Sequence, residues 1–283
     1  MRIAYTADLH GNAAAYVALF DLARQEEANA VVVGGDLLPH AIRRDSALET
    51  QRGFVEGQLA SLLRAFRALC PDMAVYLLPG NDDWAAAYAA VEALEAEGLV
   101  CPLHDRVYQL DADLWLAGYA CVPPTPFSIK DFERHDDTEA PPFSFEHAYT
   151  SRGGVVRPIE RAEFDAQPSI AAELAELARR SDPRRTIYVC HSPPAGMPLD
   201  LMPNGRHVGS RALRSFIEQH QPPLTLHGHI HEAPALSGQF AARIGATWCV
   251  NPGSDQRRFH GVVIDIDEGM VRANHTVYGS AMQ

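Results

Sequence analysis

The chain has 283 residues, of which 47% are hydrophobic, and these values are typical of a globular protein with a sizeable core. Its 24 basic and 36 acidic residues give a formal net charge of −12, and the basic residues are dispersed, so we expect no interface with nucleic acid. Five scattered cysteines without paired spacing indicate reduced thiols and a cytoplasmic location. We find no signal peptide and no apolar run of membrane-spanning length, and therefore expect no association with a membrane.

Short apolar runs recur along the chain and predict buried strands. They cover residues 2–7, 30–33, 74–78, 114–118, 186–190, 224–226, 247–250 and 261–266. Segments with helical spacing separate the first four runs, at residues 13–27, 46–69 and 84–97. This alternation predicts an α/β layer in the first half of the chain. Further helices are expected at 170–180, capped by Ser169, and at 210–220, and the closely spaced strands near the C-terminus predict a second sheet of more antiparallel character.

Residues 122–167 interrupt this pattern with a stretch that is rich in proline, aromatic and charged residues. It includes Pro141, Pro142 and Phe143 and the acidic residues Asp136, Asp137 and Glu139. Long connections inside a compact protein are usually functional lids or disordered segments. The aromatic residues favour a packed lid, inserted in a single domain that spans residues 1–283.

Five polar clusters follow apolar runs, at points where a strand would give way to a loop. They are Asp8 with His10, Asp36, Asn81, His191, and His229 with His231. All seven residues can offer oxygen or imidazole nitrogen to a cation. One divalent ion would use only part of this set, whereas two ions bridged by one carboxylate would use all of it. Asp36 follows paired glycines, which allow a sharp turn and close approach, and is the natural bridging ligand.

Some of these clusters also have simpler interpretations. Taken alone, Asp8 and His10 could be a loop carboxylate and a surface histidine, and Asn81 could be a turn residue or a helix cap. The histidines at positions 227, 229 and 231 are harder to explain in this way, since burying three imidazoles without partners is costly. The order of the clusters along the chain decides between the interpretations.

In chain order, the motifs D-x-H, G-D, G-N-x-D, H and G-H-x-H resemble the calcineurin-like metallophosphoesterase superfamily, from residue 8 to about residue 255. The resemblance implies two packed mixed β-sheets flanked by helices, a four-layer αββα sandwich with the metals at the strand ends. It also implies a hydrolase of phosphoric esters whose dinuclear metal centre activates water for in-line attack on phosphorus. One ion would be held by Asp8, His10, Asp36 and His231, and the other by Asp36, Asn81, His191 and His229. His227 falls outside the motif and is expected to support the structure.

One residue departs from the pattern that many members of this superfamily share. In those proteins a histidine follows the asparagine and can donate a proton to the leaving group, whereas this chain has Asp82. An aspartate of ordinary pKa is ionised at pH 7 and would repel a phosphate dianion. The chain therefore resembles the small phosphodiesterase branch that lacks this histidine, with Asp36, Asn81 and Asp82 as catalytic residues.

Several alternatives stay open at this point. The same site could belong to a phosphomonoesterase or a nuclease, and the fold could serve as a non-catalytic protein-binding scaffold, although all seven ligands are retained. Manganese, iron and zinc all suit the ligand set, and manganese or iron is favoured because the ligand clusters contain no cysteine. The expected partner is a phosphorylated small molecule or nucleotide, which Asn12, Arg206 and His207 could contact, although a helix cap and an exposed loop explain these residues equally well. The turn that begins at Asn251 is expected to shape the site.

Overall fold

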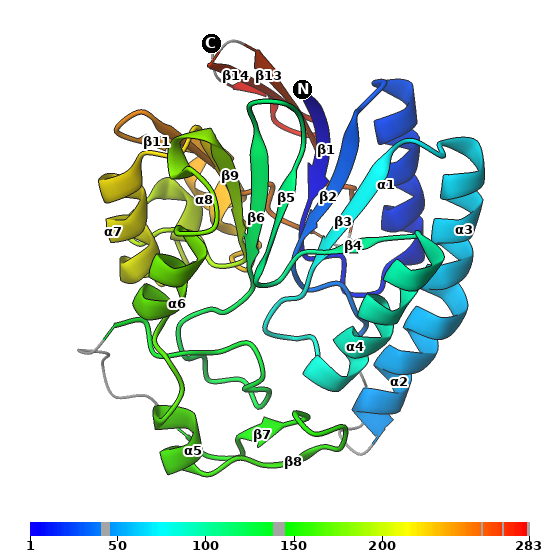
Figure 1. Ribbon diagram of the computed structural model, residues 1–283. Helices are drawn as coiled ribbons and strands as arrows, with labels where there is room; N and C mark the ends of the chain where they lie inside the picture. The colour runs from blue at the N-terminus through cyan, green and yellow to red at the C-terminus, as the bar shows by residue number, and fades with distance from the viewer. Residues whose placement is uncertain (41–45, 138–144, 256, 268, 282–283) are drawn as a thin grey trace.

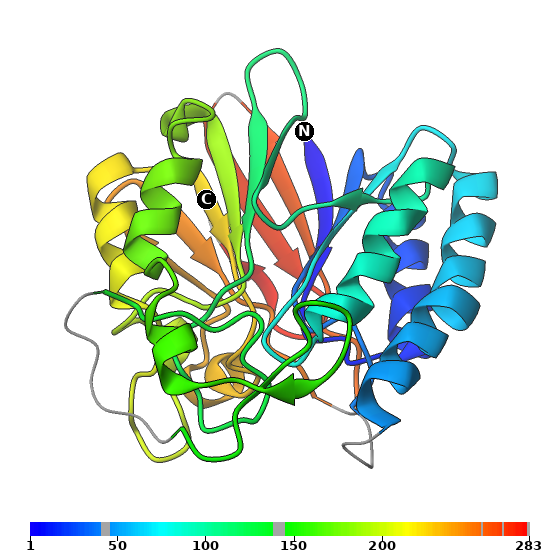
Figure 2. The same ribbon diagram turned by 60° about the horizontal axis from the view of Figure 1, so that its bottom comes forward.

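Two large mixed β-sheets form the centre of the molecule, and helices flank them on both sides (Figures 1 and 2). The computed structural model describes residues 1–40, 46–137, 145–255, 257–267 and 269–281. Helices α1 to α4 lie on the side of the first sheet, and α6 and α7 lie together on the side of the second (Figure 1). This is the four-layer arrangement that the resemblance implied.

The first sheet has seven strands in the order β15-β14-β13-β1-β2-β3-β4. Their bounds are β1 Arg2–Thr6, β2 Ala30–Gly34, β3 Ala74–Leu78, β4 Cys101–Pro102, β13 Val262–Asp267, β14 Met270–His275 and β15 Gly279–Ala281. Strands β1 to β4 are parallel, and β13 pairs antiparallel with β1, where Tyr5 lies opposite Val262. The expectation for the C-terminal strands was therefore wrong in one respect. Strands β13 to β15 are antiparallel, but they complete the first sheet instead of forming a second one.

The second sheet has six strands in the order β11-β12-β10-β9-β6-β5. Their bounds are β5 Arg106–Gln109, β6 Trp115–Tyr119, β9 Thr186–Cys190, β10 Leu224–Leu226, β11 Ala241–Ile244 and β12 Thr247–Val250. The four central strands are parallel, and the two edge strands pair antiparallel with their neighbours. The central strands β9 and β10 are buried on both faces, which explains why they read as continuous apolar runs in the sequence.

The five expected helical segments are all present, and two short helices, α5 and α8, were not predicted. Their bounds are α1 Ala13–Gln25, α2 Ala47–Gly53, α3 Ala60–Leu69, α4 Ala85–Ala93, α5 Arg161–Asp165, α6 Ile170–Leu177, α7 Arg211–His220 and α8 Ala233–Ser237. A π-helical stretch, Phe54–Leu59, joins α2 to α3, so the expected helix at 46–69 is continuous but not uniform. Ser169 and Ser210 cap their helices as expected, because their side chains accept hydrogen bonds from the N–H groups of Ala172 and Leu213. Among the described residues, no helix is both long and apolar enough to cross a membrane.

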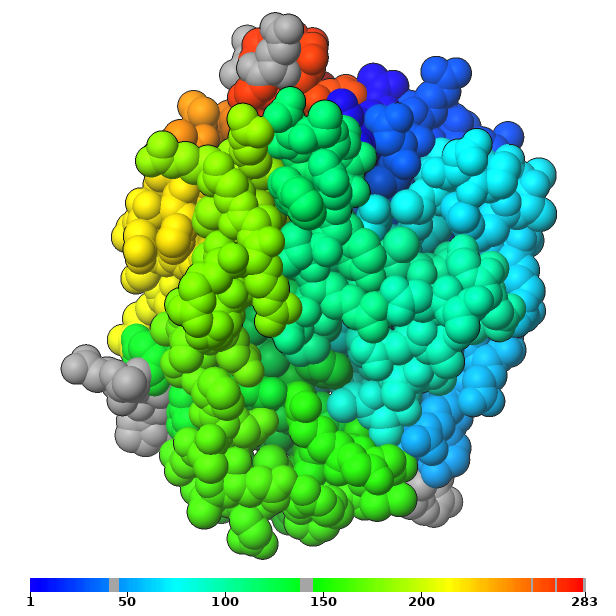
Figure 3. All heavy atoms as spheres, in the orientation of Figure 1, coloured from blue at the N-terminus to red at the C-terminus, as the bar shows by residue number. Residues whose placement is uncertain are grey.

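The insertion at 122–167 packs against the first half of the chain. It carries a two-stranded sheet, β7 Tyr149–Thr150 with β8 Arg157–Pro158, and helix α5, and it forms the lower part of the surface in Figure 3. The buried carboxylate of Asp131 accepts hydrogen bonds from the N–H groups of Ala85, at the start of α4, and of Ser151. Of the aromatic residues on which the expectation of a packed lid rests, Phe132 is buried and Phe145 packs against Phe164, whereas Phe127 is exposed. Glu139, Pro141, Pro142 and Phe143 of this insertion lie outside the described residues.

A buried hydrogen bond joins the two sheets near the ends of their central strands. The hydroxyl of Tyr5, on β1, donates to the carbonyl oxygen of His227, just after β10, at 2.6 Å. Gly34 leaves room for this contact, since a Cβ there would lie 2.1 Å from the Tyr5 hydroxyl oxygen. The loops that follow β1, β2 and β10 are therefore held in fixed relative positions.

We expect Tyr5→Phe to lower the free energy of unfolding by about 1 to 3 kcal/mol, because the buried carbonyl of His227 loses this donor. Urea denaturation followed by circular dichroism measures the change. Tyr76→Phe in β3 is the matched control, since the hydroxyl of Tyr76 has no hydrogen-bond partner within the described chain, and we expect a change below about 0.5 kcal/mol there. Equal losses in both variants would show that the bond between the sheets contributes nothing.

Candidate metal centre

The loops after five strands bring the predicted ligands to one place, at the carboxyl ends of β1, β2, β3, β9 and β10. Asp8, His10, Asp36 and His231 each offer an atom within 4.8 Å of the others. The Nε2 atoms of His10 and His231 face each other at 3.2 Å. The expected ligands of one ion thus lie together.

The expected ligands of the second ion adjoin this group. His191 Nε2 lies 3.3 Å from Asp36 Oδ2 and 3.9 Å from Asp8 Oδ1, so Asp36 stands between the two histidines His10 and His191. The rings of His191 and His229 are 5.3 Å apart. Asn81 is buried beside this cluster and donates its side-chain N–H to Asp82 Oδ1 at 3.3 Å, which leaves its Oδ1 atom free.

Several buried polar atoms of this cluster have no hydrogen-bond partner among the residues that the structure describes. They are Nδ1 of His10, Oδ1 of Asn81 and Nε2 of His191. Unpaired buried polar atoms are uncommon in folded proteins because each one loses its hydration without compensation. A cation would give Asn81 Oδ1 and His191 Nε2 a partner, and it would separate the two imidazole nitrogens that now face each other. Carboxylate, amide oxygen and imidazole together form a donor set that suits divalent transition metals. The residues therefore fit a metal centre.

The backbone at this site is strained. Asp8, His10, Asp36 and His229 adopt φ angles of 58°, 44°, 51° and 66°, a region that residues other than glycine rarely enter. Such strain costs of the order of 1 kcal/mol or more at each residue and is concentrated at functional sites. Gly80 permits the close approach of the loops, since a Cβ there would lie 2.1 Å from Asp36 Oδ1. The fold thus holds four of the seven expected ligands in conformations that they would not adopt alone.

Burial and mutual attraction shift the ionisation of these groups in opposite directions. Burial favours a neutral Asp36, but the charges of His191 and His10 outweigh it and hold the pKa of this carboxyl well below its usual range. Burial also disfavours the charged imidazole of His191, yet Asp36 and Asp8 raise its pKa to about 9. His231 behaves in the same way beside Asp8, with a pKa of about 9. The protein alone therefore neutralises its buried carboxylates with two protons that a cation must displace.

Two supporting groups escaped the sequence analysis. Asp83 is fully buried and accepts hydrogen bonds from the N–H groups of Leu37, Leu38 and Gly80 at 2.8 to 2.9 Å, so it ties the loop of Asp36 to the loop of Asn81. Burial and the nearby Asp36 raise its pKa to about 8. The ring nitrogen Nδ1 of His191 lies 2.8 Å from the carbonyl oxygen of Gly34, which turns Nε2 toward the site.

His40 is a further residue that the sequence did not single out. Its ring stacks on that of His10 with a centroid distance of 4.2 Å, and its Nδ1 lies 3.6 Å from Asp82 Oδ2. It comes from the loop after β2, four residues beyond Asp36, where neither a motif nor a spacing marks it. Asp82 thus has the imidazole of His40 beside it, although position 82 itself is not a histidine.

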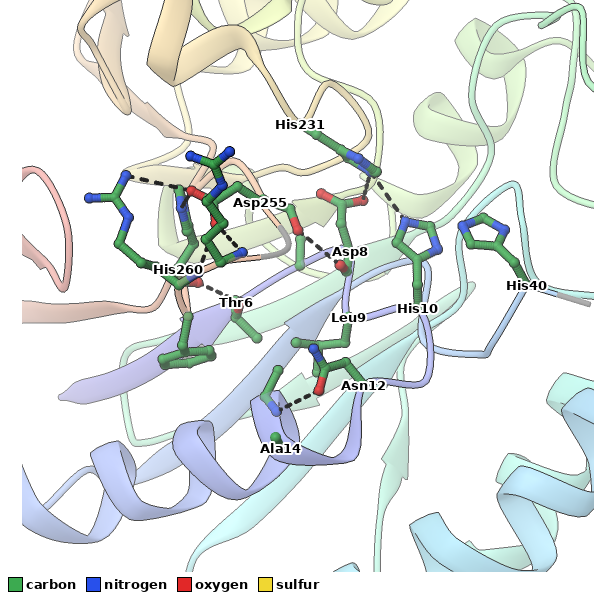
Figure 4. Close-up of a pocket in the computed structure, with 16 residues that line it drawn as sticks. Thr6, Asp8, Leu9, His10, Asn12, Ala14, His40, His231, Asp255 and His260 are labelled. Atoms are coloured by element: carbon green, nitrogen blue, oxygen red, sulfur yellow. Dashed lines mark hydrogen bonds and ion pairs between the residues drawn. The ribbon is translucent and has the colours of Figure 1, made fainter.

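A cavity of about 770 Å³ opens beside the metal ligands (Figure 4). Its lining includes Asp8, His10, His40, His231, Asn12, Ser254, Asp255, Arg257, Arg258, Phe259 and His260. The side chain of Asn12 accepts the hydrogen bond that caps α1, which confirms the helix-cap interpretation. Asn12 also lines the cavity, and its contact with a substrate stays a prediction.

Arg206 and His207 are not among the described residues that line this cavity. Arg206 is exposed on a loop, and His207 Nδ1 pairs with Asp200 Oδ1 at 2.6 Å.

His227 and Asn251 support the structure around the site. The ring nitrogens of His227 face the hydroxyl of Thr225 and backbone carbonyls, and Asn251 donates to the carbonyl oxygens of Gly228 and Ile230, which position the histidine loop.

Comparison with known proteins identifies the family. The model of the calcineurin-like phosphoesterases matches residues 1–233. The chain belongs to this family. It is a hydrolase of phosphoester bonds in a family that depends on two metal ions, and the cluster of Asp8, His10, Asp36 and His231 is a possible site for one.

Solved structures that resemble this phosphoesterase share its fold at low sequence identity. TT1561 of Thermus thermophilus is 18% identical, with a TM-score of 0.57 over 97% of this chain and 98% of that one. A dimetal phosphatase from Danio rerio is 12% identical, with a TM-score of 0.55 over 97% and 95%. GAP50, the anchor in the inner membrane complex of Plasmodium, is 11% identical, with a TM-score of 0.55 over 100% and 89%. No curated protein gives a significant match.

We expect Asp36→Asn to remove most of the bound metal and to lower phosphoester hydrolysis by at least about a hundredfold, because a neutral amide cannot bridge two cations as a carboxylate does. Elemental analysis by mass spectrometry and a 4-nitrophenyl ester assay measure the two effects. Asp267→Asn, at an exposed position in β13, is the control and should keep its bound metal and its hydrolytic activity. An active Asp36→Asn protein with full metal content would contradict the assignment.

Metal affinity should rise with pH up to about pH 9. His191 and His231 hold protons below their pKa values of about 9, and each must release its proton when a cation binds. We expect the association constant for Mn²⁺ to increase by about tenfold per pH unit for each proton displaced, and to level off above that pH. Calorimetric titration with Mn²⁺ between pH 6.5 and 9.5 measures this. An affinity that does not change with pH would show that these two histidines are not ligands.

Proposed function

We propose that this protein is a phosphodiesterase. The observation that carries the proposal is the position of the Asp82 carboxylate, whose Oδ2 lies 4.0 Å from Nδ1 of the expected ligand His10. A carboxylate here occupies the end of the site where many relatives place a histidine. The charge of the substrate phosphate then decides which esters are accepted, since a diester carries one negative charge and a monoester carries nearly two.

The protonation of Asp82 determines how strongly it discriminates. Burial, together with the adjacent charge of Asp36, raises the pKa of Asp82 to about 7 in the protein alone. Positive charge in the metal centre would lower this pKa again, because it favours the ionised form. Asp82 would then be a carboxylate at neutral pH and would disfavour a dianion.

The residues of the site would hold two divalent ions, of manganese, iron or zinc, with Asp8, His10, Asp36 and His231 on one side and Asp36, Asn81, His191 and His229 on the other. Such ions, when bound, stabilise negative charge on phosphoryl oxygens and lower the pKa of water. Asp36 would act as the shared ligand, since its Oδ2 atom lies between His10 Nε2, at 3.8 Å, and His191 Nε2, at 3.3 Å.

Other side chains would orient the substrate and the ligands. Asn81 donates to Asp82, and Asp36 Oδ1 accepts the backbone N–H of Asp82 at 2.9 Å, so hydrogen bonds link the proposed bridging ligand to the proposed selectivity residue. Asn12 and His40 lie on the cavity wall within the same region and could donate hydrogen bonds to phosphoryl oxygens. The buried position of Asp8 and Asp36 keeps water from weakening these electrostatic contacts.

A non-catalytic scaffold and a nuclease are the alternatives. GAP50 is an anchor on a similar fold, but this chain keeps all seven expected ligands, which a scaffold has no need to retain. The net charge of −12 disfavours a nuclease. Mn²⁺-dependent cleavage of aryl phosphodiesters without cleavage of single-stranded DNA would separate these functions.

We also propose a cytoplasmic location, since all five cysteines are free thiols.

We expect the manganese-loaded enzyme to hydrolyse bis(4-nitrophenyl) phosphate with a higher kcat/KM than 4-nitrophenyl phosphate. Asp82→Asn should raise the monoester-to-diester ratio of kcat/KM by about tenfold, because it removes one negative charge next to the phosphate. Asp267→Asn, which removes the same charge far from the cavity lining, should leave the ratio unchanged. A wild-type preference for the monoester would overturn the proposal.

A further inference from the structure

The cavity continues beyond the metal ligands along the segment Ser254 to His260, of which residue 256 lies outside the described chain. In Figure 4, Asp255 and His260 lie on the side of Asp8 that is remote from His40. The volume of about 770 Å³ falls within the range typical of pockets for whole small molecules, about 300 to 1,000 Å³. One phosphoryl group would fill only a small part of it, so the remaining space can accept a large part of the substrate.

The turn that forms this wall is fixed through its backbone. Asp255 Oδ1 accepts hydrogen bonds from the N–H groups of Arg257 and Arg258, both at 2.7 Å. His260 braces the same turn, with Nε2 3.0 Å from Asp255 Oδ2 and Nδ1 3.0 Å from the carbonyl oxygen of Pro252. The two guanidinium groups are not needed for these contacts. The arginine side chains can therefore be replaced without removing the bonds that shape the turn.

Two arginines, Arg257 and Arg258, bring positive charge to this wall. Arg258 lies 3.5 Å from Asp255 Oδ2 and is exposed, so its charge is only partly balanced. Arg257 makes no ion pair with any residue that the structure describes, and it also lines the cavity. The chain as a whole carries a net charge of −12, which makes two adjacent guanidinium groups on a cavity wall a local exception. Planar guanidinium groups suit paired hydrogen bonds to phosphate and carboxylate.

We propose that Arg257 and Arg258 bind a second anionic group of the substrate, carried on the ester arm that lies along this wall. The inference rests on the proposed phosphodiesterase function and narrows its substrate class to diesters with a phosphate or carboxylate on one arm. The scissile phosphoryl group occupies the metal centre, and the arm extends from Asp8 toward Asp255. The arginines then select the substrate by charge, at a distance from the reacting atoms.

Three synthetic diesters that differ only in one arm test this selection. Each contains a 4-nitrophenyl leaving group, and the other arm is phenyl, 4-carboxyphenyl or 4-phosphonooxyphenyl. We expect the Mn²⁺-loaded wild-type enzyme to show a kcat/KM at least about tenfold higher for the charged arms than for phenyl, as expected for charge-assisted hydrogen bonds to arginine. The larger of the two charged-arm effects identifies phosphate or carboxylate as the preferred group.

In the double variant Arg257→Gln/Arg258→Gln, the kcat/KM for each charged arm should lie within about twofold of the kcat/KM for the phenyl arm. Arg24→Gln/Arg179→Gln is the matched control, because it removes the same total charge from exposed positions, on α1 and just after α6, that do not line the cavity. We expect the control to keep the wild-type preference. An unchanged preference in the arginine variant, or no preference in the wild type, would overturn the inference.

A binding measurement separates this inference from the proposed function. Calorimetry compares phenylphosphonate with 1,4-phenylenebisphosphonate, which the enzyme cannot hydrolyse, on the Mn²⁺-loaded wild type and on both double variants. Tighter binding of the bisphosphonate that is lost only in Arg257→Gln/Arg258→Gln supports the second anionic site, even if the enzyme prefers monoesters. Equal binding of the two ligands to the wild type counts against the site, whatever the ester preference.

Discussion

Two buried carboxylates that meet at one point are the constraint on which this structure depends. Asp8 and Asp36 both lie within 4 Å of His191 Nε2, and His231 Nε2 lies 3.4 Å from Asp8. Like charges in a buried site repel each other strongly, and their desolvation is costly, so the fold must supply positive charge there. Protonated imidazoles supply it in the protein alone, and cations can take their place. The electrostatics of the site therefore favour metal binding before any substrate is considered.

The sheets provide the rigidity that holds these groups together. Each ligand loop begins at the carboxyl end of a central strand, and the strands are fixed by neighbours on both sides. Asp83 joins two of the loops through three backbone N–H groups, and Tyr5 joins the two sheets. These bonds keep four ligands at positive φ, a conformation that isolated loops would relax. Strain at the site is thus sustained by packing and hydrogen bonds away from it.

The sequence predicted the central strands well, because buried strands appear as apolar runs. The seven expected ligands follow the ends of those runs, and the structure brings four of them within 4.8 Å of one another. The sequence missed the edge strands and β14, which lies next to an edge, because their patterns are weaker. In β14, exposed and buried residues alternate from Met270 to His275. Placing β13 beside β1 requires a pairing between residues more than 250 positions apart, which no local pattern specifies. The antiparallel strands were consequently assigned to the wrong sheet.

The parts of the site that escaped prediction depend on contacts between distant loops. His40 gains its place by stacking on His10, and Asp83 gains its role from N–H groups more than 40 residues away. In the sequence, Arg257 and Arg258 are only one of several pairs of adjacent arginines. The structure shows that they line the same cavity as the expected metal ligands. In contrast, Arg206 and His207 looked promising because they lie between ligand clusters in the sequence. In the structure His207 pairs with Asp200, and neither Arg206 nor His207 is among the described residues that line the cavity, so their contact with a substrate stays a prediction.

The pairing of β1 with β13 has a consequence for how the protein is made. During synthesis Asp8 and Asp36 leave the ribosome early, whereas His229, whose N–H donates to Asp8 at 3.0 Å, follows some 200 residues later, and β13 later still. The growing chain therefore carries its acidic ligands without their partners for most of its synthesis. The expected ligands can come together only after His231 has been made, so metal capture would follow the synthesis of both sheets' central strands and would distinguish chains that reach β13 from shorter ones.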